Sequence, residues 1–429
     1  MGVHLKTYHD ALDFLYARTT GKWKLGLERV QDLLRLLGDP QRQLRTMHVA
    51  GTNGKGSVCA TLDSVLRARG LRVARYTSPH LIDFPERFLV DGVPVASDRI
   101  VEWVDRWTPE VERLGATFFE ATTAMAFQFF AEAGVDVAVV ETGLGGRLDA
   151  TNVLLPLVAG VTNIQIDHVE YLGATREEIA FEKAGIFKRG VPAIVGEPDA
   201  DIRALLVAHA RGHGATPIRA VYDEAALSEV TVTADETRFV SRTARGEREV
   251  RTPLVGRHQA SNALVALAML DALPDDLRPD DASVEQGLAT VRLPGRFQRV
   301  GKHLFDVAHN PDGATVLAQT LSEARLPHPV VAVFSVLSDK DWMAMMAALA
   351  PQVDRFIVTN SPTAPPSRAW NVIDVLAYAR AQGWDAVVVR DFDRALSRAS
   401  DEGATVVVTG SFHTVGDAMS RLQVSPTAG

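Results

Sequence analysis

The chain has 429 residues, which is longer than one ordinary hydrophobic core, so two or three domains are expected. Its hydrophobic fraction of 46% and charged fraction of 23% are typical of soluble globular proteins, and a net charge of −8 argues against general nucleic-acid affinity. Cys59 is the only cysteine, which excludes an intrachain disulfide and a cysteine metal cluster. No apolar run is long enough to span a membrane, and residues 1–10 lack the apolar core of a signal peptide, so we expect a cytosolic protein without a membrane partner.

A glycine-rich stretch after a short apolar run is the most informative feature of the N-terminal part. A helical pattern over residues 8–37, interrupted near Thr19–Gly21, is followed by an apolar run that ends at Ala50. An amphipathic pattern with helical spacing then covers residues 58–69. The turn between them contains Gly51, Thr52, Asn53, Gly54, Lys55, Gly56 and Ser57. This order predicts a strand, a tight loop and a helix, which is the context in which backbone N–H groups bind phosphate.

Lys55 and Ser57 give this loop the chemistry of a nucleotide site. Lys55 supplies a full positive charge to a phosphate, and the hydroxyl of Ser57 is placed to reach a bound Mg²⁺. The common P-loop pattern has Ser or Thr directly after the lysine, whereas here Gly56 stands between them. A glycine-rich turn can also be a simple tight connection, so the later motifs have to decide between the two interpretations.

The next two predicted strands end in polar segments, and the second of these segments suits a magnesium site. Residues 72–76 form a predicted strand that stops at a Ser-Pro-His segment beginning at Ser78. Helical patterns cover residues 97–114 and 118–133. A continuous apolar run over residues 135–140 is typical of a central parallel strand, and Glu141 follows it. A carboxylate at the carboxyl end of a buried strand lies where open α/β sheets bind ligands, and Mg²⁺ prefers oxygen ligands.

The chain continues with alternating strands and helices, interrupted by one β-rich segment. Strands are predicted over residues 158–164 and 192–195, and helices over residues 175–187, 200–211, 254–270 and 284–291. Residues 230–250 instead alternate polar and β-branched side chains, which predicts a small antiparallel side sheet. His168 follows the first of these strands and Lys183 lies in the next helix. Taken alone, such a histidine is usually structural and such a lysine is usually exposed or ion-paired.

A Pro-Gly pair within residues 293–298 marks the expected domain boundary, after which the α/β alternation restarts in a smaller, mostly parallel sheet. The strands of that sheet are predicted over residues 304–308, 330–334, 356–359, 386–389 and 405–408. We therefore predict an α/β protein of two domains. Residues 1–295 form a P-loop ATPase domain with a mostly parallel sheet and a small antiparallel side sheet, and residues 296–429 form a smaller Rossmann-like domain.

Several motifs, taken in chain order, resemble the folylpolyglutamate synthase/dihydrofolate synthase branch of the Mur ligase superfamily. They are Gly51–Ser57, Ser78–His80, Glu141–Arg147, Asp167–His168, Glu182–Ile186, His258–Gln259, Pro294–Arg296 and Asp306–Pro311. Residues 24–30 also resemble the Gly-Leu-Glu-Arg segment that helps form the pterin side of the family's site. Residues 334–341 and 410–416 match less closely, with Ser335 where the family usually has glycine. The resemblance covers nearly the whole chain.

The resemblance implies an ATP-dependent ligase. In this family a folate or pteroate carboxylate attacks the γ-phosphate of ATP, which gives an acyl phosphate and ADP. The amine of L-glutamate then displaces phosphate and forms an amide. The expected acceptors are dihydropteroate, (poly)glutamylated reduced folates, or both, and the expected state is a monomer.

The resemblance also implies roles for single residues. With Ser57, the expected magnesium ligands are Ser78, Glu141 and His168, although imidazole is an unusual Mg²⁺ ligand. Lys183 corresponds to a lysine that is carbamylated in the superfamily, where it meets a second Mg²⁺. Asn262 is expected near the nucleotide base, Arg296 to reach ATP from the linker, and Asp306 and His309 to face the nucleotide from the C-terminal domain. We expect Lys55, Lys183 and His309 to act in catalysis.

An acyl phosphate must be protected from water, so we expect the C-terminal domain to close over the cleft by a hinge near residues 293–298. Three alternative functions remain at this point. They are another Mur-type ligase acting on a peptidoglycan precursor, a P-loop kinase that phosphorylates a small molecule, and a nucleotide-binding switch without catalysis. The Gly26–Arg29, Ser78–His80 and Asp167–Gly173 segments argue against the first, and the long C-terminal domain argues against the second. The joint presence of Lys55, Glu141, His168 and Lys183 argues against the third.

Overall fold

The N-terminal domain is built on one large twisted sheet. The computed structural model describes residues 7–19, 26–243 and 246–425, so Lys24 and Leu25 of the predicted pterin-side segment lie outside the described residues. The sheet has eight strands in the order β4-β3-β2-β5-β1-β6-β7-β8, and only β3 and β4 run antiparallel to their neighbours. Its strands are β1 (Thr46–Ala50), β2 (Val73–Tyr76), β3 (Phe88–Val90), β4 (Val93–Pro94), β5 (Val137–Glu141), β6 (Val158–Val161), β7 (Ala193–Val195) and β8 (Ile218–Ala220).

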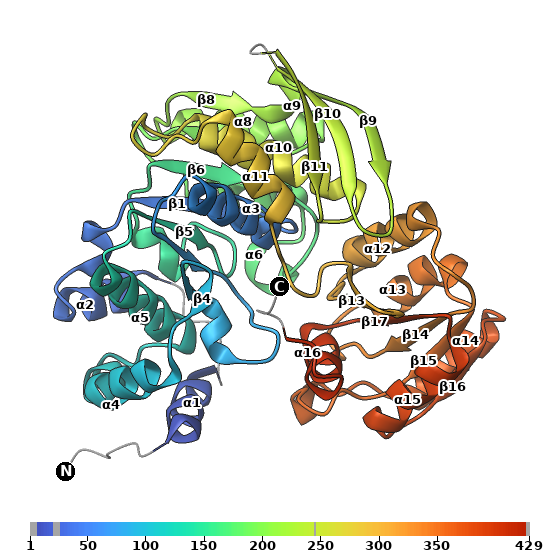
Figure 1. Cartoon of the computed structure of the whole chain (residues 1–429). Coiled ribbons are helices and arrows are strands. Elements are labelled where there is room, and N and C mark those ends of the chain that lie inside the picture. The colour runs from blue at the N-terminus through green and yellow to red at the C-terminus, as the bar shows by residue number, and fades with distance from the viewer. Residues whose placement is uncertain (1–6, 20–25, 244–245, 426–429) are drawn as a thin grey trace.

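Helices cover both faces of this sheet (Figure 1). One face packs against α3 (Lys55–Ala68), α10 (Arg257–Asp271) and α11 (Asp281–Thr290). The other face packs against α1 (Tyr8–Tyr16), α2 (Glu28–Leu36), α4 (Ser97–Leu114), α5 (Phe118–Ala133), α7 (Arg176–Ala184) and α8 (Ala200–Gly212). The short helices α6 (Val169–Leu172) and α9 (Val221–Glu224) follow β6 and β8. Strands β1 and β5 are buried along their whole length, which explains why most of their residues are apolar.

The predicted helices over residues 97–114 and 118–133 are confirmed as α4 and α5. Thr117 and Glu120 form a capping box at the start of α5, and the two helices end at Gly115 and Gly134, whose φ angles are 60° and 62°. Left-handed glycines of this kind end helices without a steric penalty from a Cβ atom. Phe127 and Phe130 of α5 are fully buried, as expected for a helix that is apolar on most faces.

A three-stranded antiparallel sheet packs beside α10, as the alternating pattern predicts. Its order is β11-β10-β9, with β9 (Ala226–Val232), β10 (Thr237–Thr243) and β11 (Gly246–Thr252). Phe239 and Val250 point from this side sheet into the core that α3 and α10 share. The side sheet therefore extends the hydrophobic core of the N-terminal domain rather than forming a domain of its own.

The C-terminal domain, coloured orange to red in Figure 1, has a six-stranded sheet in the order β12-β13-β17-β14-β15-β16, and only β12 is antiparallel. Its strands are β12 (Gln298–Val300), β13 (His303–Asp306), β14 (Val330–Phe334), β15 (Arg355–Val358), β16 (Ala386–Val388) and β17 (Thr405–Thr409). Its helices are α12 (Pro311–Ala324), α13 (Trp342–Leu349), α14 (Val372–Ala381), α15 (Phe392–Glu402) and α16 (Phe412–Arg421). Two hydrophobic clusters lie on opposite faces of the sheet. The predicted α/β class is therefore confirmed, as are the mostly parallel sheet with its small antiparallel side sheet and the smaller C-terminal α/β sheet.

Some sequence expectations differ from the structure in detail. The predicted strand over residues 158–164 ends at Val161, and the helix predicted from residue 58 begins three residues earlier, at Lys55. The short strands β3, β4 and β8 were not expected, because strands of two or three residues carry too little periodicity to be recognised. The division at residues 295/296 stays a prediction. Among the described residues, no helix combines the length and the apolar composition that crossing a bilayer requires.

Candidate active site

One cavity of about 320 Å³ lies between the two domains, at the carboxyl ends of β1, β5 and β6 and facing the end of β13. Every residue predicted to bind nucleotide or metal, or to act in catalysis, lines this cavity. They are Gly51, Thr52, Asn53, Gly54, Lys55, Gly56, Ser57, Ser78, Glu141, His168, Lys183, Asn262, Arg296, Asp306 and His309. Open α/β sheets bind ligands at this edge because the loops that follow parallel strands gather there.

The glycine-rich loop is held in a tight turn in front of α3. Gly51 and Gly54 have φ angles of 150° and 84°, and a Cβ atom on Gly51 would lie 1.8 Å from Oγ1 of Thr162. The side chain of Lys55 folds back, so its Nζ donates to the carbonyl oxygens of Gly51 and Thr52 at 3.1 Å each. The backbone N–H of Thr52 donates to the carbonyl of Asn163 at 2.8 Å, which ties the loop to the segment after β6. The loop therefore has a fixed shape and an ammonium group inside it.

Glu141 is the buried carboxylate of the cavity. The backbone N–H of Ser78 donates to its Oε2 at 3.2 Å, and Nζ of Lys55 lies 4.0 Å from its Oε1. Burial raises the pKa of Glu141, although Lys55 opposes the shift. A cation beside this carboxylate would favour the ionised form.

The donor atoms along this wall of the cavity suit Mg²⁺. In the described part of the chain, no cluster of three or more His, Cys, Asp or Glu side chains could hold a metal by itself. The wall instead offers the carboxylate of Glu141 and the hydroxyls of Ser57 and Ser78. Mg²⁺ accepts such an incomplete set because it keeps waters and takes further oxygens from bound phosphates. The residues present therefore fit a Mg²⁺ ion that arrives with a nucleotide.

Lys183 is fully enclosed beneath the glycine-rich loop. Its side chain is 4% exposed, and its Nζ donates to the carbonyl oxygen of Gly51 at 2.9 Å. Burial and the neighbouring charge of Lys55 lower the pKa of Lys183 to about 7. Near neutral pH a large fraction of this lysine is therefore an uncharged amine, which is the form that reacts with carbon dioxide.

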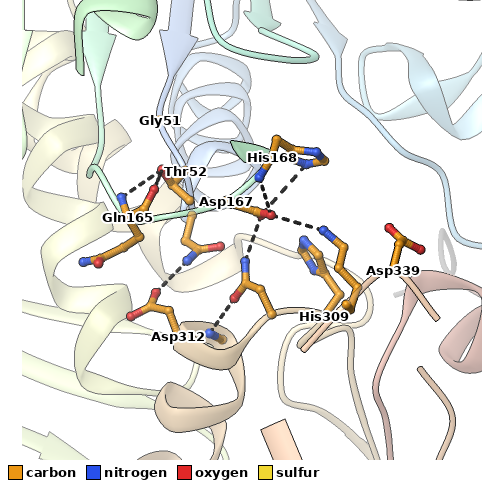
Figure 2. Close-up of polar contacts among 12 residues, drawn as sticks. Gly51, Thr52, Gln165, Asp167, His168, His309, Asp312 and Asp339 are labelled. Carbon is orange, nitrogen blue, oxygen red and sulfur yellow. Dashed lines mark hydrogen bonds and ion pairs between the residues drawn. The ribbon is translucent and has the colours of Figure 1, made fainter. Parts of the chain in front are cut away.

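Asp167 lines the cavity, but the Asp167–His168 motif suggested no role for it. Its carboxylate accepts hydrogen bonds from Lys340 and Asn310 of the C-terminal domain, each at 3.1 Å (Figure 2). Burial alone would raise the pKa of Asp167, but His168, Lys340 and Asn310 outweigh it and hold that pKa well below its usual range. The signal that could have revealed Asp167 and Lys340 is their position, since both follow the carboxyl end of a predicted strand.

Arg296 and Asp306 lie on the C-terminal side of the cavity. The guanidinium of Arg296 stacks 5.2 Å from the centroid of the Phe412 ring, and burial lowers its pKa. Asp306 accepts from the backbone N–H groups of Phe297 and Ala308 at 2.9 Å each, and burial raises its pKa. Asp306 therefore fixes the chain on both sides of β13, while the guanidinium of Arg296 remains turned toward the cavity.

His309 and Asn262 complete the set of predicted residues. Burial lowers the pKa of His309 to about 4, so its imidazole is neutral near pH 7, and its Nδ1 lies 3.0 Å from the carbonyl oxygen of Val307. Asn262 receives no hydrogen bond from the loop, but its Oδ1 would lie 2.2 Å from a Cβ atom on Gly54. Only glycine at position 54 leaves room for the Asn262 amide.

A second, smaller pocket of about 60 Å³ adjoins the cavity, and Leu144 and Leu172 line both. Its other lining residues are Gly26, Thr117, Phe119, Glu120, Arg147, Leu148, Asp149, Ala150, Tyr171 and Glu182. Arg29 forms an ion pair of 3.0 Å with Glu120 at its edge, which links the predicted pterin-side segment to α5. Asp149 lines this pocket but was not predicted, because it lies just beyond the Glu141–Arg147 motif.

Comparisons with known proteins agree with this architecture. Residues 49–270 match the Mur ligase middle domain, and residues 295–412 match the Mur ligase, glutamate ligase domain. The dihydrofolate synthase/folylpolyglutamate synthase of Bacillus subtilis (strain 168) is 33% identical over 431 residues, which cover 97% of this chain and 99% of the relative.

Solved structures show the same similarity. Mycobacterium tuberculosis folylpolyglutamate synthase complexed with ADP and AMPPCP has a TM-score of 0.88 and 34% identity, covering 98% of this chain and 100% of that chain. A bifunctional folylpolyglutamate synthase/dihydrofolate synthase with Mn, AMPPNP and L-glutamate bound has a TM-score of 0.83 and 34% identity, covering 96% and 98%. The chain thus belongs to the Mur ligase family, in its folylpolyglutamate synthase/dihydrofolate synthase branch, and is an ATP-dependent amide ligase.

Proposed function

We propose that this ligase joins L-glutamate to dihydropteroate and also to reduced folates that already carry glutamate, with release of ADP and phosphate. The observation that carries the proposal is that a phosphate-binding loop and Glu141 of one domain and Arg296 and His309 of the other line the same cavity. The name of the Bacillus subtilis relative combines both activities, and another relative has L-glutamate bound, which supports this choice of substrates.

The smaller pocket beside the cavity is the proposed acceptor site. Because Leu144 and Leu172 line both hollows, an acceptor seated between Phe119 and Asp149 can direct its carboxylate toward Lys55. The pocket also presents aromatic and polar side chains together, as a pterin ring requires. Attack of that carboxylate on the γ-phosphate breaks the terminal phosphoanhydride bond and gives an acyl phosphate and ADP. The glutamate amine then displaces phosphate and loses a proton.

The residues of the cavity mainly position and neutralise the phosphate groups, which is what phosphoryl transfer requires. Lys55 and Arg296 supply positive charge from opposite domains. The neutral imidazole of His309 can hydrogen-bond within the cavity without adding charge. Ser57, Ser78, Glu141 and His168 would hold Mg²⁺ brought by ATP, and that ion would neutralise phosphate charge.

Lys183 is the proposed site of carbamylation. The neutral amine can add carbon dioxide and lose a proton, which converts a buried cation into an oxygen donor for a second Mg²⁺. Its pKa of about 7 and its position beside the glycine-rich loop support this proposal. The presence of Mn in a relative supports a divalent ion, and the second ion is part of the proposal.

We also propose that the domains divide at residues 295/296 and that the linker is the hinge. Gly295 and Phe297 have φ angles of 68° and 46°, so two residues of the linker adopt left-handed conformations. Such conformations are common where a chain changes direction under constraint. The monomeric state, the cytosolic location and the lack of nucleic-acid partners stay predictions.

The test is glutamate-dependent phosphate release with ATP and Mg²⁺, comparing 7,8-dihydropteroate with tetrahydrofolate as acceptor. We expect release with both acceptors and its loss in Lys55→Met, because the loop then lacks its ammonium group. Lys302→Met removes a lysine at the β12–β13 turn, outside the cavity, and should behave as wild type. Release with one acceptor would restrict the proposal to that activity, and no release with either would contradict it.

A further inference from the structure

The carboxylate of Asp167, in the N-terminal domain, accepts hydrogen bonds from two separate loops of the C-terminal domain. Asp167 Oδ1 accepts from Lys340 Nζ, and Asp167 Oδ2 accepts from Asn310 Nδ2, each at 3.1 Å. These donors lie 173 and 143 residues away in the sequence, after β14 and after β13. The side chains of Asp167 and Lys340 are only 13% and 14% exposed, so water screens the pair weakly. The three side chains can meet only when the two domains are in contact.

The same carboxylate holds the backbone of His168. The N–H of His168 donates to Asp167 Oδ1 at 2.9 Å, so this oxygen accepts from both His168 and Lys340. His168 has a φ of 51° at the start of α6, a left-handed conformation that costs a non-glycine residue energy and needs support from its surroundings. Figure 2 shows Asp167 beside His168 at the centre of these contacts, with His309 on the side of the C-terminal domain.

The contact on the C-terminal side is anchored at the start of α12. Asn310 caps α12, since its Oδ1 accepts from the N–H of Gly313 at 2.7 Å. The other end of the same amide therefore points its Nδ2 at Asp167. A second contact lies nearby, where Nδ2 of Asn53 in the glycine-rich loop donates to Oδ2 of Asp312 at 2.6 Å. The start of α12 is thus placed against the phosphate-binding loop by two side-chain contacts.

We propose that Asp167 is a positioning residue for the ligase reaction. Through Asp167, the orientation of His168 toward the cavity depends on contact with Asn310 and Lys340 of the C-terminal domain. The inference rests on the proposed function because turnover is one of its readouts. When the C-terminal domain is seated, Asp167 is held from both sides and His168 keeps its constrained backbone. When the domain moves away, Asp167 loses two donors and this support weakens.

Double-mutant kinetics test the coupling between Asp167 and Lys340. D167N keeps the shape of the side chain and removes its charge, and K340M removes the ammonium group. Each should lower kcat on the order of 10- to 100-fold, as loss of a residue that supports a metal ligand does, while the Kd of an ATP analogue stays within about twofold. The double variant should be no slower than D167N alone, and K340R should retain more activity than K340M.

Arg45 and Asp276 provide the matched control, because they form an ion pair of 2.5 Å that is 40% and 62% exposed. Arg45 precedes the amino end of β1, whereas the cavity lies at the carboxyl end of that strand, and neither residue lines the cavity. R45M and D276N should leave kcat unchanged. The proposal would be overturned if the fold-decrease in kcat of the D167N/K340M double variant equalled the product of the two single decreases. Wild-type kcat in K340M would also overturn it. A lowered Tm in D167N with normal kcat would indicate a merely structural role.

Small-angle scattering separates this inference from the proposed function. With AMPPNP and Mg²⁺, wild type should give a smaller radius of gyration than D167N or K340M, because the variants lose contacts between the domains. Equal radii would contradict the inference even if all three proteins were active. If wild type released no phosphate with any folate acceptor, the proposed function would be wrong, while the scattering comparison would still decide the role of Asp167.

Discussion

Lys183 of α7 and Gly51 of the glycine-rich loop are joined by a hydrogen bond of 2.9 Å from the lysine Nζ to the glycine carbonyl oxygen. Lys55 donates to the same oxygen at 3.1 Å, so one backbone carbonyl lies between two lysine side chains. Burial disfavours a charge on Lys183, and the nearby ammonium of Lys55 adds to the cost of protonating it. The depressed pKa of Lys183 therefore follows from the structure of the phosphate-binding loop.

Bicarbonate should activate the enzyme more strongly above pH 7 than below it. Because the pKa of Lys183 is about 7, the fraction of neutral amine rises as the pH passes through that value, and only the neutral amine forms a carbamate. Enzyme depleted of carbon dioxide should have low activity that bicarbonate restores. The measurement is turnover against pH with and without bicarbonate, together with a ¹³C NMR carbamate signal from labelled bicarbonate.

Lys183→Arg and Lys188→Arg are the matched pair for this prediction. Lys188 follows α7 and is half-buried, and its Nζ donates to Oδ1 of Asn152 at 2.7 Å, outside the cavity. The carbamate signal should disappear in Lys183→Arg and remain in Lys188→Arg. A signal that persists in Lys183→Arg would assign the carbamate to another residue.

Gly54→Ala should weaken ATP binding. The new Cβ would lie 2.2 Å from Oδ1 of Asn262, and a φ of 84° is itself unfavourable for alanine by about 1–2 kcal/mol. Either the loop or the Asn262 side chain must move, so the KM for ATP should rise about 10-fold or more. Gly70→Ala is the control, since Gly70 has a φ of 87° and open space around it. Similar ATP KM values in the two variants would show that the Asn262 contact does not matter.

Gly416→Ala should slow turnover by separating the domains. Gly416 lies in α16 of the C-terminal domain, and a Cβ there would come 2.0 Å from the carbonyl oxygen of Leu81, in the N-terminal loop after β2. Overpacking typically costs about 1–3 kcal/mol. If that cost falls on the contact between domains, kcat should fall about 5- to 150-fold while stability of the separate domains changes little.

The control for this variant is Gly212→Ala, at the end of α8, where no atom lies within 4 Å of the added Cβ. Its kcat and its Tm should remain near those of wild type. Wild-type kcat and an unchanged radius of gyration with AMPPNP in Gly416→Ala would contradict the prediction. They would show that the loop containing Leu81 moves to make room for the added methyl group.

Stability of the N-terminal domain should fall as the pH drops from about 6.5 toward 3. His48 of β1 is fully buried, and burial together with Lys188 lowers its pKa to about 3. Between the two pKa values the unfolded chain binds a proton that the folded chain does not, so the free energy of unfolding decreases with falling pH by up to about 1.4 kcal/mol per unit. Urea unfolding of wild type and His48→Gln between pH 4 and 7 measures the slope.

His48→Gln should flatten this dependence, because the titrating group is gone and an amide can still reach Oγ1 of Thr151, which lies 2.8 Å from Nε2 of His48. His9→Gln removes an exposed histidine of α1 and should keep the wild-type slope. Equal slopes in wild type and His48→Gln would assign the pH dependence to other groups.

Most of the fold and the predicted site could be derived from the sequence because they are local. The glycine-rich turn, the apolar runs of β1 and β5 and the two helices after β4 each lie within a short window, and their periodicity or turn residues are visible there. Residues that end parallel strands share one edge of a sheet, which is enough to place Glu141 at the ligand-binding edge, and the family resemblance added Ser78. The short strands β3 and β8 were not predicted, because they are defined by hydrogen bonds to neighbouring strands and not by a local sequence pattern.

The sequence by itself determined the α/β class and the phosphate-binding loop, and its resemblance to a known family named many of the side chains that line the cavity. Only the tertiary structure decided that Lys183 and Lys55 share the carbonyl of Gly51, and that Asp167 meets Lys340 across the cleft. The contacts of Lys183 and Asp167 join segments more than a hundred residues apart, and no periodicity or spacing encodes them. A depressed pKa or an ion pair between domains depends on distance and burial, which exist only after the chain has packed.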